Sequence, residues 1–268
     1  MLHRLAALRP VQSIVAWVPR EKARHVVREA LPRRRHRVVV VRDRAEFEAT
    51  FRTSLVDAAL VDLGGATDEG WQIAELAREF PSVPFVAIVP GRAADAPAIA
   101  RCVELDFADV LADGVDDAAA GELLDPLCFT TRFAAAMHEP PPSLVLTTEL
   151  QRATWRALVA HAGRPVRTET LARALGMTRE HLSRTFSAHG APNLKRVIDL
   201  VRLLAAAELA KNPGYDVGDV ARVLEFASSS HLSTTAQRVV GTRPASLARL
   251  RSVDLIDRFA HGRTRSRS

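Results

Sequence analysis

The chain has 268 residues, a length that predicts two domains of ordinary size rather than one. Hydrophobic residues make up 47% and charged residues 25%, the balance of a globular protein with ample core. No apolar run approaches the ~20 residues of a membrane span, and the N-terminus lacks the pattern of a secretory signal. Two cysteines, Cys102 and Cys128, are too few for a disulfide framework. We therefore expect a cytoplasmic protein with no membrane partner.

The net charge of +6 is unevenly divided along the chain. Residues 1–142 hold 17 Lys and Arg against 21 Asp and Glu, whereas residues 143–268 hold 20 against 10. Cationic side chains release condensed counterions when they bind phosphates, which supplies most of the sequence-independent affinity for DNA. The charge alone fits either a solvated basic surface or a surface that contacts nucleic acid. In either case the basic surface lies in residues 143–268.

Short apolar runs alternate with helical patterns through the first half. We expect strands at residues 13–18, 37–41, 57–63, 83–89 and 108–111. We expect helices at residues 21–31, 45–52, 70–80, 94–105 and 116–137, the last irregular near Pro126. Continuous β-branched runs between helices are typical of parallel strands covered on both faces. Right-handed crossovers would wind them into an α/β domain over 12–137, preceded by an N-terminal segment, 1–11.

A proline-rich stretch separates the two halves. Pro140–Pro142 cannot continue a helix, so we take 138–143 as a semi-rigid linker. An all-helical domain is expected over 144–252, with helices at residues 149–162, 168–175, 178–188, 194–210, 217–224 and 229–240. Residues 253–268 are expected to be a tail with a disordered end.

Four of these helices form two helix-turn-helix patterns, joined by the long helix 194–210. In the first, the expected inward side chains are Leu171, Ala172, Leu175, Leu182 and Phe186. In the second they are Val220, Ala221, Val223, Leu224, Phe226, Leu232, Ala236 and Val240. Thr178, and Ser228 or Ser229, can cap the two second helices. Two such units in tandem can place two recognition helices in successive major-groove segments of one duplex.

The tandem pattern resembles the DNA-binding domain of the AraC/XylS family of bacterial transcription regulators. The telling stretches are L-A-R-A-L-G-M-T-R-E-H-L-S-R-T-F and D-V-A-R-V-L-E-F-A-S-S-S-H-L-S-T-T-A-Q-R-V-V-G-T-R-P. The family's base-contacting positions fall on Glu180, Ser183, Arg184, Ser230, His231 and Thr234. The outward-facing Arg179 and Arg238 complete the expected DNA-binding set. The resemblance implies double-stranded DNA as partner, location at the nucleoid when bound, and an encounter with RNA polymerase.

The second unit departs from the family pattern. Glu225 stands where Gly is usual, Thr234 where Arg is common, and Leu232 and Ala236 replace larger aromatic residues. The apolar replacements keep the helical register, so the fold should survive. We expect the first unit to be the stronger reader of DNA.

The stretch Asp57–Ile73 resembles the third strand and following loop of response-regulator receiver domains, a flavodoxin-like fold with a five-stranded parallel sheet. Asp62 falls on the phosphoacceptor position. Phosphoryl transfer there needs Mg²⁺ and further carboxylates, but Val18 and Pro19 stand where that acidic pair would be. Val89 and Asp113 replace the usual Thr/Ser and Lys. We therefore expect a degenerate receiver that mediates contacts or binds a ligand in the crevice at the carboxyl ends of the strands. A phosphorylation-dependent regulator is kept as the alternative.

No catalytic set, metal site or cofactor motif emerges from the sequence. Gly64-Gly65 lacks the spacing of a phosphate-binding loop, and no nucleophile, base and orienting group come together. A sequence-specific, non-enzymatic transcription regulator is the leading interpretation, with homodimerisation through the receiver-like domain left open. The alternatives are an enzyme built on the α/β domain and a nucleoid-type protein that binds DNA without sequence preference.

Overall fold

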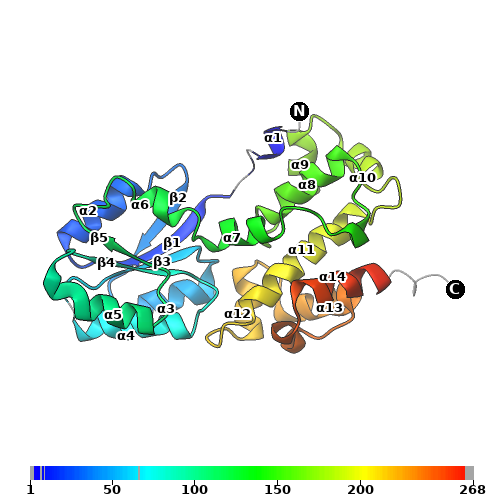
Figure 1. Cartoon of the computed structure of the whole chain (residues 1–268). Coiled ribbons are helices and arrows are strands. Elements are labelled where there is room, and N and C mark those ends of the chain that lie inside the picture. The colour runs from blue at the N-terminus through cyan, green and yellow to red at the C-terminus, as the bar shows by residue number, and fades with distance from the viewer. Residues whose placement is uncertain (1–2, 7, 9, 66, 263–268) are drawn as a thin grey trace. The chain divides into compact units, whose positions relative to one another are not determined.

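A computed structural model describes residues 3–6, 8, 10–65 and 67–262 (Figure 1). The contacts divide the chain into two compact units. One, here called the receiver-like unit, comprises Val11–Arg132 and Asn212–Tyr215. The other, the helical unit, comprises Met1–Pro10, Phe133–Lys211 and Asp216–Ser268. Among the described residues, no helix is long and apolar enough to cross a membrane.

The receiver-like unit is built on a five-stranded sheet in the order β2-β1-β3-β4-β5, with every neighbouring pair parallel. The strands are β1 (Gln12–Trp17), β2 (His36–Val40), β3 (Ala58–Asp62), β4 (Phe85–Val89) and β5 (Asp109–Ala112). All residues of the central strands β3 and β4 are buried, whereas the edge strands are partly exposed. Buried, mainly apolar runs therefore form the centre of the sheet, as the sequence predicts. This strand order is that of flavodoxin-like folds.

Helices cover both faces of the sheet (Figure 1). They are α2 (Glu21–Ala30), α3 (Arg44–Thr53), α4 (Asp68–Ala74) continued by the 3-10 helix η1 (Glu75–Arg78), η2 (Ala93–Asp95) leading into α5 (Ala96–Glu104), and α6 (Ala120–Leu124). One core lies under α2 and α6 and is aliphatic, with Ile14, Leu60 and Ile88 at its centre. On α3, Phe51 stacks on Phe80 and Phe85 at centroid distances of 4.3 and 5.8 Å.

The helical unit surrounds the long helix α11 (Leu194–Leu209), whose central residues are almost all buried. Its other elements are α1 (His3–Ala6), the 3-10 helix η3 (Pro142–Leu144), α8 (Glu149–Val159), α9 (Thr168–Ala174), α10 (Arg179–Phe186), α12 (Val217–Val223), α13 (Ser229–Val240), η4 (Pro244–Arg249) and α14 (Ser252–His261). Together with the parallel sheet of the other unit, these helices confirm the predicted α/β plus all-α fold class.

Three predicted boundaries differ from the structure. The helix expected over 116–137 is two helices, α6 and α7 (Phe129–Ala136), because Pro126 lies between them. The expected linker 138–143 belongs to the helical unit, whose boundary falls between Arg132 and Phe133, inside α7. Helix α7 ends before the prolines, as predicted. Leu144, which follows them, is fully buried, so residues 138–143 pack with the helical unit and are not a free linker.

The third difference is at the C-terminal end. Residues 253–261, expected to be tail, form nearly all of α14, because Leu255, Ile256 and Phe259 share one apolar face and are buried. The disordered end predicted for the last residues falls on 263–268, outside the described residues.

Candidate functional site

The first helix-turn-helix unit consists of α9, a tight turn and α10. Gly176 in the turn has a φ of +65°, a left-handed conformation that glycine adopts without a steric penalty. The Thr178 hydroxyl then accepts a hydrogen bond from the His181 N–H at 3.2 Å and caps α10. Leu182 and Phe186 are fully buried, so the predicted inward face of α10 is confirmed.

A buried glutamine on α8 secures the other end of α10. The Gln151 amide donates to the carbonyl oxygens of Phe186 and Ala188, at 2.8 and 3.1 Å. Its Oε1 accepts from the N–H groups of Thr147 and Thr148, at 2.8 and 2.9 Å. One fully buried side chain therefore provides hydrogen-bond partners for backbone groups at both the start of α8 and the end of α10.

The predicted DNA-contact residues of α10 lie on its outer face. Arg179, Glu180 and Arg184 are exposed and Ser183 is half-buried. Arg179 pairs with Glu169 at 3.3 Å and with Glu180 at 3.1 Å, but both acids are more than half exposed. Exposed pairs of this kind contribute little free energy. The Arg179 guanidinium is therefore available to exchange these partners for a phosphate.

The second unit, α12, turn and α13, reaches the same geometry without glycine in its turn. Glu225, where Gly is usual in the resembled family, has a φ of +53°. The next residue, Phe226, is buried, and the Ser228 hydroxyl caps α13 by accepting from the His231 N–H at 3.0 Å. Leu232, Ala236 and Val240 are buried, which confirms the expectation that the replaced positions keep the helical register.

The predicted contact residues of α13 are exposed but partly engaged within the unit. Ser230, His231, Thr234 and Arg238 all lie on the exposed face. The Thr234 hydroxyl donates to the Ser230 carbonyl at 3.0 Å. The Arg238 guanidinium donates to Asp199 of α11 at 2.8 Å. The contact residues predicted on α10 are also engaged, since Arg184 contacts the His181 ring at 3.3 Å, but their partners are exposed, whereas Asp199 is mostly buried.

Two side chains that the sequence did not single out support the recognition units. Gln151 is one, and the other is Arg202 of α11, which stacks 3.8 Å over the Phe226 ring. For Gln151, the capping-box pattern at Thr148–Gln151 was a signal available in the sequence. No local signal existed for Arg202, because its contacts lie more than twenty residues away along the chain.

In the receiver-like unit, Asp62, which the sequence resemblance predicts at the phosphoacceptor position, forms an internal ion pair. Asp62 ends β3 with its side chain fully buried. Arg20, just after β1, donates to Asp62 from its backbone N–H at 3.1 Å and from Nε at 2.7 Å. The same guanidinium donates to Asp113, after β5, at 2.7 Å. Burial acts to lower the pKa of Arg20, but hydrogen bonds and charges of the two aspartates outweigh it and raise that pKa.

This triad exchanges the charges that the receiver resemblance implies. A cation, Arg20, follows directly after Val18 and Pro19, which occupy the positions of the family's acidic pair. An acid, Asp113, stands where lysine is usual in the resembled domains. Gly64 makes room for the arrangement, because a Cβ there would lie 2.1 Å from the Arg20 guanidinium carbon. The buried carboxylate of Asp62 is thus neutralised by the chain itself.

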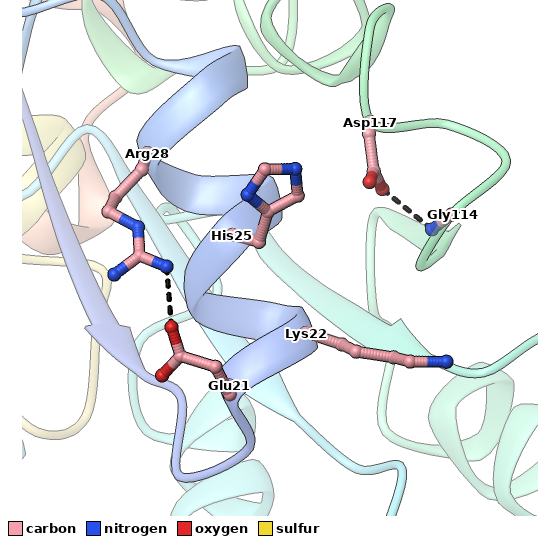
Figure 2. A pocket seen from close by; sticks show the side chains of 6 residues that line it. All are labelled: Glu21, Lys22, His25, Arg28, Gly114 and Asp117. Atoms are coloured by element: carbon pink, nitrogen blue, oxygen red, sulfur yellow. Dashed lines mark hydrogen bonds and ion pairs between the residues drawn. The ribbon is translucent and has the colours of Figure 1, made fainter.

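A shallow hollow lies beside α2 (Figure 2), with a cavity volume of about 330 Å³. It is lined by Glu21, Lys22, His25, Arg28, Gly114 and Asp117. Its polar groups engage one another: Arg28 pairs with Glu21 at 2.6 Å, and the Gly114 N–H donates to Asp117 at 2.7 Å. The hydrogen bond and charge of Arg28 lower the pKa of Glu21. The lining therefore mixes both signs of charge and does not favour a single class of ligand.

Metal-ligand and thiol chemistry find no support in the described part of the chain. No three His, Cys, Asp or Glu side chains there are grouped to hold a metal ion. Burial raises the pKa of the Cys102 thiol to about 11 and, together with Asp57 and Asp125, raises that of Cys128 further. Both cysteines are free and buried, so they behave as small apolar core residues.

Comparison with known proteins bears on the C-terminal part of the chain. Residues 171–249 match the family described as a helix-turn-helix domain. None of the curated proteins compared matches the chain. Among seven solved chains that match, full-length FixJ from B. japonicum has 12% identity and a TM-score of 0.39, and the alignment covers 84% of this chain and 96% of that one. Residues 171–249 are thus a helix-turn-helix DNA-binding domain of the AraC type.

Proposed function

We propose that the protein is a sequence-specific transcription regulator that inserts α10 and α13 into adjacent major-groove segments of one duplex. The observation that carries this proposal is the repetition, inside one compact unit, of a capped recognition helix with a buried apolar face and an exposed polar face. Each such helix matches the dimensions of a major groove. The net positive charge of the second half of the chain supports phosphate contact.

Within this function, the two recognition helices have unequal roles. The proposed readers on α10 are Arg179, Glu180, Ser183 and Arg184, where an arginine can make a bidentate contact with guanine. Those on α13 are Ser230, His231 and Thr234, whose side chains are shorter or already engaged. We infer a stronger first contact and a weaker second one.

Selection of bound fragments from random DNA tests the proposal. A specific regulator should enrich a motif and prefer it at least ~10³-fold over unrelated DNA. Binding to every sequence alike, with an equally steep loss in added salt, would identify a nucleoid-type protein instead.

We further infer that the receiver-like unit works without phosphorylation. Arg20 already supplies positive charge to Asp62, and both Asp62 oxygens accept hydrogen bonds from it. Mg²⁺ at this position would have to displace a guanidinium held by two buried aspartates. The unit is then left to mediate contacts, including homodimerisation.

Treatment with acetyl phosphate and Mg²⁺ tests this second point. Intact-mass measurement of the wild-type chain should show no added phosphoryl group. A phosphoryl adduct on the wild type that is absent from Asp62→Asn would instead support the phosphorylation-dependent alternative.

A further inference from the structure

Two side chains on α11 contact the second helix-turn-helix unit. Asp199 and Arg202 lie three residues apart, which places them on the same face of the helix. Asp199 accepts from the Arg238 guanidinium of α13 at 2.8 Å. Arg202 donates to the carbonyl oxygens of Leu224 and Glu225, at 2.8 and 3.2 Å. We call Asp199 and Arg202 the α11 bracket.

The Asp199–Arg238 pair differs from the pairs on α10 in the burial of its acid. The Asp199 side chain is 13% exposed, whereas Glu169 and Glu180, the partners of Arg179, are 53% and 73% exposed. A partly buried pair is screened less by salt than an exposed one. Arg238 is therefore held more firmly than Arg179, although its own side chain remains 58% exposed.

The nearby positive charges do not fully offset the desolvation of the buried Asp199 carboxylate. Desolvation raises the pKa of Asp199, and the nearby charges of Arg238, Arg202, Lys195 and His231 only partly oppose that rise. A carboxyl whose pKa is raised on folding stabilises the fold below its unfolded pKa, and this stabilisation is lost as pH rises through the folded pKa. At neutral pH the main consequence of Asp199 is thus geometric, because it fixes where α13 lies against α11.

Arg202 supports the turn that precedes α13. Glu225 is left-handed there, at a φ of +53°, a conformation that is strained for a non-glycine residue. Arg202 satisfies the carbonyls of that turn and stacks on Phe226. Phe226 in turn meets the His231 ring edge-on, with 5.7 Å between centroids. The arginine is thereby linked through Phe226 to the first turn of the recognition helix.

We propose that the α11 bracket sets the position of α13 for DNA reading, and that Arg238 is a positioning residue acting through Asp199 rather than a reader of bases. This inference rests on the proposed function, because it assumes that α13 enters a groove. Arg238 then differs from the readers on the same helix, Ser230, His231 and Thr234.

A double-mutant cycle in the full-length chain tests the role of Arg238. The probes are the DNA fragment recovered by selection with the wild-type chain and two copies of it, each scrambled in one groove segment. The measured quantity is the ratio of affinities for the intact and scrambled fragments, which cancels the effect of changed net charge. Asp199→Asn and Arg238→Gln should each lower the second-segment ratio about tenfold, and the double variant should lower it no further.

The controls separate the possible failures. Lys211→Gln, at an exposed site just beyond α11, should leave both ratios unchanged. If Arg238→Gln lowers the second-segment ratio as much in the Asp199→Asn background as in the wild type, Arg238 contacts DNA itself and the inference is wrong. A wild-type chain without a second-segment ratio above one would instead refute the two-helix function.

The role of Arg202 is tested by whether its substitution affects only the second-segment affinity ratio. Arg202→Lys keeps the charge but loses the planar fork and its stacking. It should lower the second-segment ratio at least about fivefold while leaving the first-segment ratio at the wild-type value, which also shows that the variant is folded. Equal losses in both ratios, or no loss in either, would overturn the role of Arg202.

Discussion

At the scale of single residues, Gly64 offers a direct test of the Arg20–Asp62 pair. Its Cα lies so close to the Arg20 guanidinium that an added methyl group must displace it. We expect Gly64→Ala to displace the Arg20 guanidinium from Asp62 and to lower the free energy of unfolding by about 1–3 kcal/mol, because the buried carboxylate then keeps only its backbone donors. Urea unfolding of the full-length variant and wild-type chains measures this change in the free energy of unfolding.

The neighbouring glycine provides the matched control. A Cβ on Gly65 would meet only the Thr67 methyl group, at 3.8 Å, an ordinary contact. Gly65→Ala should therefore be within about 0.5 kcal/mol of the wild type. Equal losses in the two variants would show that Gly64 matters for its backbone and not for Arg20.

The two buried thiols predict a pH dependence. Burial raises the pKa of Cys102 from an ordinary 9.0 to about 11, and that of Cys128 also rises. Because the folded pKa lies above the unfolded one, this contribution to stability is complete below about pH 9. It should be lost as pH rises toward 11. Unfolding titrations at pH 8 and 10 should show a lower stability at pH 10, and a smaller difference in Cys102→Ala.

At the scale of elements, the recognition helices are predictable from the sequence, whereas the long-range contacts that hold them in place are not. The inward faces of α10 and α13 follow from spacings of three and four residues, because side-chain periodicity is a local property. Arg20 meets Asp113 across 93 positions of sequence, and Gln151 meets Phe186 across 35. Such contacts depend on how elements pack, so the loss of the acidic pair was visible in the sequence while the ion pairs of Arg20 were not.

The support of α10 can be tested through Gln151. Gln151→Leu would leave the Phe186 and Ala188 carbonyls and two N–H groups without their partner. We expect a loss of about 2 kcal/mol or more, given the cost of unsatisfied buried polar groups. Amide hydrogen exchange in α10 should accelerate. Gln237→Leu, an exposed change of the same residue types on α13, should leave that exchange unaltered.

The unequal reading by the two helices gives a further prediction. Arg184→Ala should weaken binding to the selected fragment by about 10- to 100-fold, the range for loss of one good bidentate contact. Thr234→Ala should weaken it less, because its hydroxyl already donates to the Ser230 carbonyl. A gel-shift titration compares the two, and equal losses would remove the proposed asymmetry.

At the scale of the whole molecule, the chain combines a receiver-like unit whose acidic centre is internally neutralised with a helical unit that carries the DNA-binding domain. Charge follows this division, since the acidic excess lies in residues 1–142 and the basic excess in 143–268. The fold class could be predicted because apolar periodicity changes between the halves. The boundary inside α7 could not, because the helix pattern continues across it.

The reading of one duplex by both α10 and α13 is tested by selecting bound fragments from random DNA with the full-length wild-type chain. We expect a motif with two conserved blocks separated by about one helical turn, ~10 base pairs, because two recognition helices would lie on one face of the duplex. The block read by α10 should be the more strongly conserved. A motif with a single block, or no enrichment over unrelated DNA, would contradict this expectation.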